Sequence, residues 1–151
     1  MDLILVIYKY LIIIYYQNNM KLEHLGIAVK SLEASVPVFE KIFGVKAGEM
    51  EFVADQKVNV RKIKLENFDL ELLEATSPES PIGKFVEKKG EGIHHCSFQV
   101  PDVAAKLEEL KINGIQLIDQ QPRTGAEGML IAFLHPKSTN GILMELAQHS
   151  K

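Results

Sequence analysis

Two histidines and two glutamates occur at matching places in two halves of this chain. His24 and His95 stand near the starts of two apolar segments and are 71 residues apart, while Glu71 and Glu145 stand near the ends of two others and are 74 residues apart. Two imidazoles and two carboxylates make a donor set that suits divalent cobalt, manganese, iron, nickel or zinc. The spacing therefore predicts a duplicated unit in which each copy supplies one imidazole and one carboxylate to a shared metal site.

The repeat extends to the segments around the histidines. Residues 22–29 (LEHLGIAV) align without gaps with residues 93–100 (IHHCSFQV), and both are predicted to be strands. Side chains alternate between the two faces of a strand. His24 and His95 therefore fall on the small or polar face of their strands, whereas the opposite faces are apolar. His94 has the parity of the apolar face, so we expect it to pack or point outward.

A helix is predicted to follow each of these strands and to cover its apolar face. Ser31 is placed to cap the first helix and Gly44 to end it, and Asp102 and Gly114 have the same places around the second. Pro37 lies past the first turn and is expected to kink or delay the first helix.

The remaining segments complete two modules with the order strand, helix and three strands. The further strands are predicted at residues 45–53, 58–65 and 70–75 in the first module and at 115–119, 129–134 and 141–147 in the second. The fold class is therefore α+β, with two paired βαβββ modules that form one metal-lined cleft. We expect a single domain at residues 20–148, made of modules 20–76 and 91–148 joined by a short helix within 79–89.

The composition limits the class of protein. At 151 residues, with 46% hydrophobic and 25% charged residues, the chain is typical of one globular domain or of two small modules that share a sheet. A net charge of -3 without a long basic run argues against a nucleic-acid surface. The single cysteine excludes an intrachain disulfide framework.

Residues 1–19 form an apolar leader outside the repeat. Lys9 interrupts the leader, which falls short of the roughly 20 apolar residues of a transmembrane helix. It also lacks the basic start and the small residues at the cleavage site of a signal peptide. We expect the functional chain to begin at Met20 and to have no stable association with a membrane; a membrane-anchored form is the alternative.

Three stretches carry a family resemblance: residues 22–29, residues 80–98 (SPIGKFVEKKGEGIHHCSF) and residues 125–146 (GAEGMLIAFLHPKSTNGILMEL). They resemble the vicinal oxygen chelate, or glyoxalase-like, superfamily and, within it, the methylmalonyl-CoA epimerases. The resemblance covers Met20 to about Gln148. The paired modules are common to the superfamily, whereas the Gly-Ile-His-His segment together with His-Pro-Lys-Ser-Thr-Asn-Gly before Glu145 is specific to the epimerases.

The resemblance implies a divalent ion, cobalt or else manganese, bound by His24, His95 and Glu145 with Glu71 as the fourth ligand. It also implies an acyl-CoA substrate that has a carboxylate and a thioester carbonyl on either side of one carbon, and a homodimeric enzyme in the cytosol or in mitochondria; we expect a cytoplasmic one. Epimerising that carbon requires proton transfer on both faces of a planar enolate. We assign Glu145 as a ligand that doubles as a base and Glu71 as its partner on the opposite face.

One departure from the family concerns the second base. The resemblance implies a separate glutamate on the third strand of the first module, but the comparable stretch, residues 58–61, contains no carboxylate. Glu71 or a bound water must then take its place. Lys137 and Ser138 lie in a turn-rich connection and are candidates for binding the substrate carboxylate or the coenzyme A phosphates.

Two other functions remain open. A glyoxalase-type lyase would isomerise a glutathione hemithioacetal on the same metal frame, although the epimerase-like linker and the turn at Lys137 argue against it. A metal-free small-molecule-binding protein of the drug-resistance kind would use the fold without an ion. The repeated spacing of four ligand-type residues disfavours that alternative.

Overall fold

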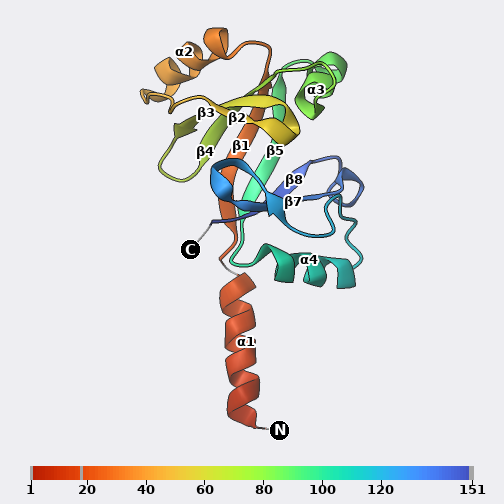
Figure 1. The fold of residues 1–151 in the computed structure, drawn as a ribbon. Coiled ribbons are helices and arrows are strands. Elements are labelled where there is room, and N and C mark those ends of the chain that lie inside the picture. The colour runs from red at the N-terminus through yellow and green to blue at the C-terminus, as the bar shows by residue number, and fades with distance from the viewer. Residues whose placement is uncertain (1, 18, 150–151) are drawn as a thin grey trace.

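The computed structural model describes residues 2–17 and 19–149 (Figure 1). The strands are β1 (Lys21–Val29), β2 (Glu51–Val53), β3 (Val58–Lys64), β4 (Asp69–Ala75), β5 (Gly92–Gln99), β6 (Arg123–Thr124), β7 (Leu130–Leu134) and β8 (Met144–Gln148). The α-helices are α1 (Leu3–Gln17), α2 (Leu32–Phe43), α3 (Pro81–Lys89) and α4 (Val103–Ile112). Three short 3-10 helices are η1 (Ala54–Gln56), η2 (Ala126–Gly128) and η3 (Pro136–Ser138).

The strands form one sheet whose order is β2-β3-β4-β1-β5-β8-β7-β6. Within each module the first strand pairs in parallel with the last, β1 with β4 and β5 with β8. The antiparallel pair β1–β5 joins the two modules at the centre of the sheet. The second half of the order therefore mirrors the first, and the predicted pair of βαβββ modules is confirmed.

The sheet curls so that strands far apart in its order approach each other. Lys62 Nζ on β3 lies 2.9 Å from Glu127 Oε2 on η2, which precedes β7. The backbone N–H of Glu127 donates to Glu51 Oε1 on β2 over 3.2 Å. These contacts connect the outer parts of the two modules, so the concave face encloses a cleft as expected.

One helix of each module packs on the opposite face of the sheet. The cluster under α2 contains the buried residues Val29, Leu32, Val36, Ile63, Leu70 and Leu72, and the cluster under α4 contains Val100, Val103, Leu107, Ala132, Leu134 and Leu146. Burying a side chain of this size stabilises a fold by about 1.5–3 kcal/mol. Val29 and Val100 in these clusters have the predicted apolar parity, which leaves the histidine face to the cleft.

The helix ends agree with the expected caps. Ser31 Oγ accepts a hydrogen bond from the N–H of Ala34, and Gly44 ends α2 in the left-handed conformation at φ 67°. The expected delay at Pro37 is wrong, because α2 begins directly after Ser31. Pro37 is exposed, and the carbonyl that it leaves without an N–H donor is near the helix start, where water can reach it.

The predicted strand at residues 45–53 is mostly irregular, and only its last three residues form β2. The N–H of Ala47 donates to Glu40 Oε1 over 2.8 Å, which ties this segment to α2, and a backbone hydrogen bond from the Gly48 N–H to the Lys62 carbonyl over 2.8 Å joins it to β3.

The predicted strand at residues 115–119 is also wrong, since a single bridge between Leu117 and Leu134 takes its place. The Asp119 carboxylate accepts the N–H of Phe133 over 2.8 Å, so a side chain occupies a position in the ladder. The outer strand of this module is β6, a few residues later.

The leader forms α1, which projects away from the sheet (Figure 1). Large apolar side chains such as Leu3, Ile4 and Tyr8 are exposed on it. No helix among the described residues combines the length and the apolar character needed to cross a membrane. That the functional chain begins at Met20 remains a prediction.

Candidate metal centre

His24 and Glu71 come from neighbouring parallel strands of the first module. In the register of β1 and β4, Gly26 stands opposite Glu71, and His24 is two residues before Gly26. Residues two apart on a strand share a face. His24 and Glu71 therefore both point into the cleft.

His95 and Glu145 have the equivalent places in the second module. β5 and β8 pair with Ser97 opposite Glu145, and His95 is two residues before Ser97. Across the central pair, His95 stands opposite Gly26. A β-carbon at Gly26 would overlap the His95 ring, so the absence of a side chain there is what allows the imidazole to cross the β1–β5 pair.

The four predicted ligands meet at the centre of the sheet. His24 Nε2 lies 2.8 Å from His95 Nε2, 3.4 Å from Glu71 Oε2 and 3.5 Å from Glu145 Oε1. One ligand atom each from His24, His95 and Glu145 lie within 4.8 Å of one another. Glu71 is outside that group of three but borders the same pocket. None of the four residues is more than 7% exposed.

The pocket between these residues has a volume of about 30 Å³, which is the room that one water or one ion needs. Apolar side chains, among them Val58, Leu73 and Met129, complete its wall. Glu145 Oε1 is buried and accepts no hydrogen bond, while Glu71 Oε1, also buried, has only the Lys62 ammonium at 3.3 Å. Buried carboxylate oxygens without donors are costly unless a cation is present. The donor set, the volume and the unpaired oxygen of Glu145 therefore fit a divalent metal ion.

Sequence reasoning missed Glu23, which lies beside this cluster. A register shift between Leu22 and His24 leaves Glu23 as the extra residue of a β-bulge, and a bulge re-aims side chains. The buried Glu23 carboxylate contacts His24 Nδ1, so that Nε2 is the nitrogen directed at the cluster. Carboxylates commonly orient metal-binding histidines in this way. Simple alternation puts Glu23 on the wrong face, and the sequence carries no signal for the bulge.

The surroundings shift the protonation of the cluster. Burial raises the pKa of Glu145 to about 7. Burial lowers the pKa of His24, but its hydrogen bond with Glu23 and the charges of Glu71 and Glu145 outweigh this and raise the pKa above its usual value. Burial, followed by the charges of neighbouring histidines, holds the pKa of His95 well below its usual value. His95 is therefore neutral, the state in which imidazole binds metals.

Lys62 is a second residue that sequence reasoning missed. It is buried on β3, with Nζ 3.3 Å from Glu71 Oε1 and 2.9 Å from Glu127 Oε2. Burial lowers the pKa of Lys62, but these carboxylates outweigh it and raise the pKa above its usual value. A signal was available, since Lys62 shares the parity of Val58 and Val60, which line the small pocket.

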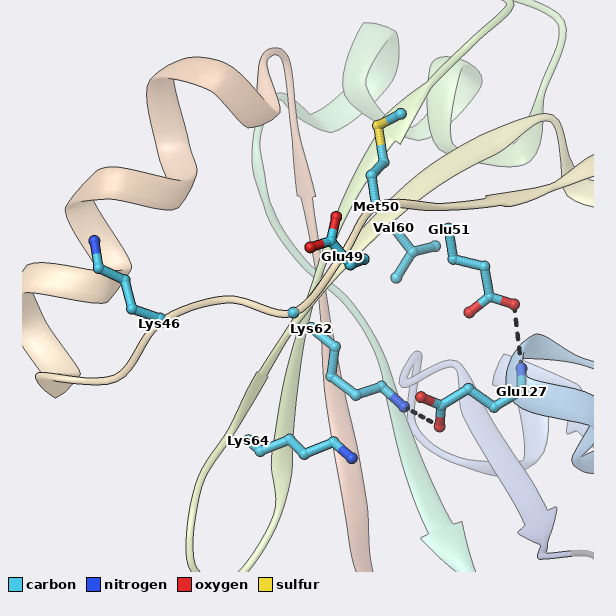
Figure 2. Close-up of a pocket in the computed structure, with 9 residues that line it drawn as sticks. Lys46, Glu49, Met50, Glu51, Val60, Lys62, Lys64 and Glu127 are labelled. Atoms are coloured by element: carbon cyan, nitrogen blue, oxygen red, sulfur yellow. Dashed lines mark hydrogen bonds and ion pairs between the residues drawn. The ribbon is translucent and has the colours of Figure 1, made fainter.

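A larger pocket of about 450 Å³ lies next to the cluster and shares Val60 with the small pocket. Its wall contains both basic and acidic residues. The basic ones are Lys46, Lys62 and Lys64, and the acidic ones are Glu49, Glu51 and Glu127. Figure 2 shows Lys62 directed at the Glu127 carboxylate and Glu51 directed at the Glu127 backbone. This pocket is large enough to admit part of a small organic substrate.

Of the other predicted residues, His94 lies beside the cluster, with its Nδ1 3.0 Å from His95 Nδ1, whereas Lys137 and Ser138 lie away from it. His94 packs its ring edge to face on Phe85 of α3, at 4.9 Å between centroids, as expected from its parity. Lys137 and Ser138 do not line the two pockets described above. Ser138 Oγ accepts the N–H of Gln116 over 2.9 Å. Binding of coenzyme A phosphates by Lys137 and Ser138 stays a prediction.

Comparison with known proteins gives a consistent result. Residues 23–133 match the family described as Glyoxalase/Bleomycin resistance protein/Dioxygenase superfamily. The chain is 41% identical to the uncharacterized protein YqjC of Bacillus subtilis, over 85% of this chain and 91% of that one. It is 38% identical to an ethylmalonyl-CoA/methylmalonyl-CoA epimerase of Cereibacter sphaeroides, over 85% of this chain and 97% of that one. It superposes with a TM-score of 0.84 on a methylmalonyl-CoA epimerase in complex with methylmalonyl-CoA and NH4+. The two are 32% identical, and the match covers 88% of this chain and 96% of that one.

Proposed function

The chain belongs to the Glyoxalase/Bleomycin resistance protein/Dioxygenase superfamily, and we propose that it is a metal-dependent epimerase that interconverts (2R)- and (2S)-methylmalonyl-CoA. Its relatives include epimerases that act on acyl-CoA esters, and the alignment with them covers most of both chains. Epimerase activity and binding of a coenzyme A ester follow from this similarity. The particular substrate, the metal dependence and the roles of individual residues are the proposal.

The observation that carries the proposal is the meeting of His24, His95, Glu71 and Glu145 around an ion-sized pocket. Each module contributes one imidazole and one carboxylate, and the buried Glu145 Oε1 there accepts no hydrogen bond. We propose cobalt, or else manganese, as the ion, because both accept mixed imidazole and carboxylate ligands. A divalent ion in this place would supply Lewis-acid stabilisation of the negative oxygen that forms when the 2-carbon loses its proton.

Two carboxylates are available to move the proton at the 2-carbon. We propose that Glu145 takes it on one face of the planar enolate and that Glu71 serves the opposite face. Glu145 Oε1 is buried and accepts no hydrogen bond, so it is free to take a proton, whereas Glu71 Oε1 is paired with the Lys62 ammonium at 3.3 Å. The apolar side chains of Val58, Leu73 and Met129 line the pocket and limit the access of bulk water. Limited access keeps solvent from protonating the enolate in place of the two carboxylates.

Further parts of the proposal concern binding and assembly. Lys137 and Ser138 would hold phosphates of coenzyme A at the rim of the cleft. The enzyme would work as a homodimer in the cytoplasm. Size measurement in solution by light scattering tests the dimer, since a monomer of 17.0 kDa would contradict it.

The direct test is deuterium exchange at the 2-position of (2R)- and (2S)-methylmalonyl-CoA in D2O. The protein is loaded with cobalt or manganese, or treated with a chelator. We expect exchange and interconversion of the epimers with either ion and loss of both with the chelator. Absence of exchange under every condition would remove the proposal. A parallel sample with a glutathione hemithioacetal separates an epimerase from a lyase.

A further inference from the structure

We propose that Lys62 binds the free carboxylate of the acyl-CoA substrate and that Glu127 occupies this position until the substrate displaces it. The inference rests on the proposed function and specifies its substrate class: acyl-CoA esters that carry a second, ionised carboxylate. No motif of the sequence assigns such a role to Lys62. Its position, burial and partners carry the argument.

Lys62 lies between the two pockets. Its Nζ is 3.3 Å from Glu71 Oε1, at the border of the ion-sized pocket, and 2.9 Å from Glu127 Oε2, in the wall of the larger one. A ligand that reaches from the larger pocket to the cluster of His24 and Glu145 must therefore pass beside this ammonium group. A carboxylate that has one oxygen at the cluster can present the other to Lys62.

The acidic groups around the cluster favour a cation at this position for an anionic substrate. Asp69 Oδ2 is 3.8 Å from Lys62 Nζ, and the carboxylates of Glu23, Glu71 and Glu145 are buried nearby. These acids repel an entering carboxylate.

Among the lysines of the larger pocket, Lys62 is the one shielded from water. Its side chain is 10% exposed, whereas that of Lys46 is 89% exposed and Lys64 is an exposed residue. Water weakens the attraction of exposed charges far more than that of buried ones. Lys62 is therefore the lysine whose charge acts most strongly on a ligand inside the cleft.

Glu127 has the properties of a displaceable partner. Its side chain is 48% exposed, and its backbone has φ 53°, a left-handed conformation that is uncommon for residues other than glycine. The hydrogen bond from its N–H to Glu51 holds the backbone independently of the carboxylate (Figure 2). Replacing the Glu127 carboxylate by a substrate carboxylate exchanges one anion for another, so Lys62 keeps a charged partner throughout.

The test compares binding of malonyl-CoA, which has a free carboxylate, with binding of acetyl-CoA, which lacks it. Isothermal titration is done on the manganese-loaded protein and on Lys62→Met, Lys62→Arg and Glu127→Gln. We expect the wild type to prefer malonyl-CoA. Lys62→Met should weaken malonyl-CoA binding on the order of 10- to 100-fold, the effect of one charge-assisted hydrogen bond, and leave acetyl-CoA binding unchanged. Lys62→Arg should retain part of the preference, and Glu127→Gln should tighten malonyl-CoA binding.

Each result has a defined meaning. Lys111→Met removes the same charge from the exposed face of α4 and serves as the control, with both ligands unaffected. Equal weakening of both ligands by Lys62→Met, or a preference for malonyl-CoA of unchanged size, would overturn the role of Lys62 while the proposed epimerase stands. If Glu127→Gln binds malonyl-CoA as tightly as the wild type or less tightly, the substrate does not displace Glu127 from Lys62. This test stays valid if Lys62→Met fails to fold. A wild type without preference for malonyl-CoA would sink the proposed substrate itself.

Discussion

Gly26 on β1 leaves open the space that the His95 ring occupies from β5. The two residues are directly opposite in the antiparallel register, and any β-carbon at Gly26 would overlap the imidazole. The two modules are joined at this pair, so the imidazole of the second module reaches His24 of the first across a missing side chain. The candidate metal centre therefore requires a residue without a side chain at position 26.

The first prediction concerns Gly26→Ala. The added methyl group must push the His95 ring aside, and we expect destabilisation of about 1–3 kcal/mol, as for other overpacked sites, together with weaker metal binding. Thermal unfolding and metal titration measure the two effects. Gly48→Ala is the matched control, because a β-carbon there meets only the carbonyl oxygen of Lys62 at 3.6 Å. Equal behaviour of the two variants would refute the steric argument.

The second prediction concerns His95→Ala. Removal of one of the two imidazoles should abolish stoichiometric metal binding and leave a folded protein, since the helix-covered clusters on the other face do not include His95. Metal content after dialysis and circular dichroism test both statements. His135→Ala, at a turn outside the cluster, should keep its metal. Retention of one ion per chain by His95→Ala would contradict the ligand assignment.

The third prediction concerns Glu23→Gln. The amide keeps the shape of the side chain but loses the charge that orients His24 through Nδ1. Loss of such an orienting carboxylate typically lowers metal affinity about 10- to 100-fold. Competition titration with a chelating dye measures the change, and Glu33→Gln on the exposed side of α2 is the control. An unchanged affinity would mean that Glu23 has no influence on the metal.

The fourth prediction concerns pH. Burial raises the pKa of Glu145 to about 7, and the carboxylates around His24 raise its pKa as well. Protons occupy both groups more fully as the pH falls below 7, and the metal must displace them. Affinity should therefore drop as pH falls, by up to about tenfold per pH unit for each displaced proton. Titration in two buffers of different ionisation enthalpy counts those protons. An affinity that stays constant between pH 8 and 6 would disprove the competition.

The fifth prediction concerns the leader. Every strand of the sheet lies within residues 21–148, and α1 projects away from them (Figure 1). A chain that starts at Met20 should therefore unfold at the same temperature and bind metal with the same affinity as the long form. Loss of folding or of metal binding in the short chain, with both kept in the long one, would show that residues 1–19 belong to the functional unit.

Much of the fold could be predicted because it depends on local patterns. The duplicated segments around His24 and His95, their alternation, and the caps at Ser31 and Asp102 each arise from a few neighbouring residues. The absence of the expected strand at residues 115–119 could not be predicted, since Asp119 makes its decisive hydrogen bond to a residue 14 positions away. Pairing decided by such a contact leaves no local pattern.

The sequence by itself determined which residues could form a metal site and on which face of their strands they lie, because side-chain alternation is a property of any extended chain. Only the tertiary structure decided that Glu23 contacts His24, through a bulge defined by the partner strand. It also decided that Lys62 meets Glu71, through the register of β3 and β4, and Glu127, through the curl of the sheet. Both depend on how strands twist and shift against one another. That geometry is set by packing between distant segments, which no stretch of neighbouring residues specifies.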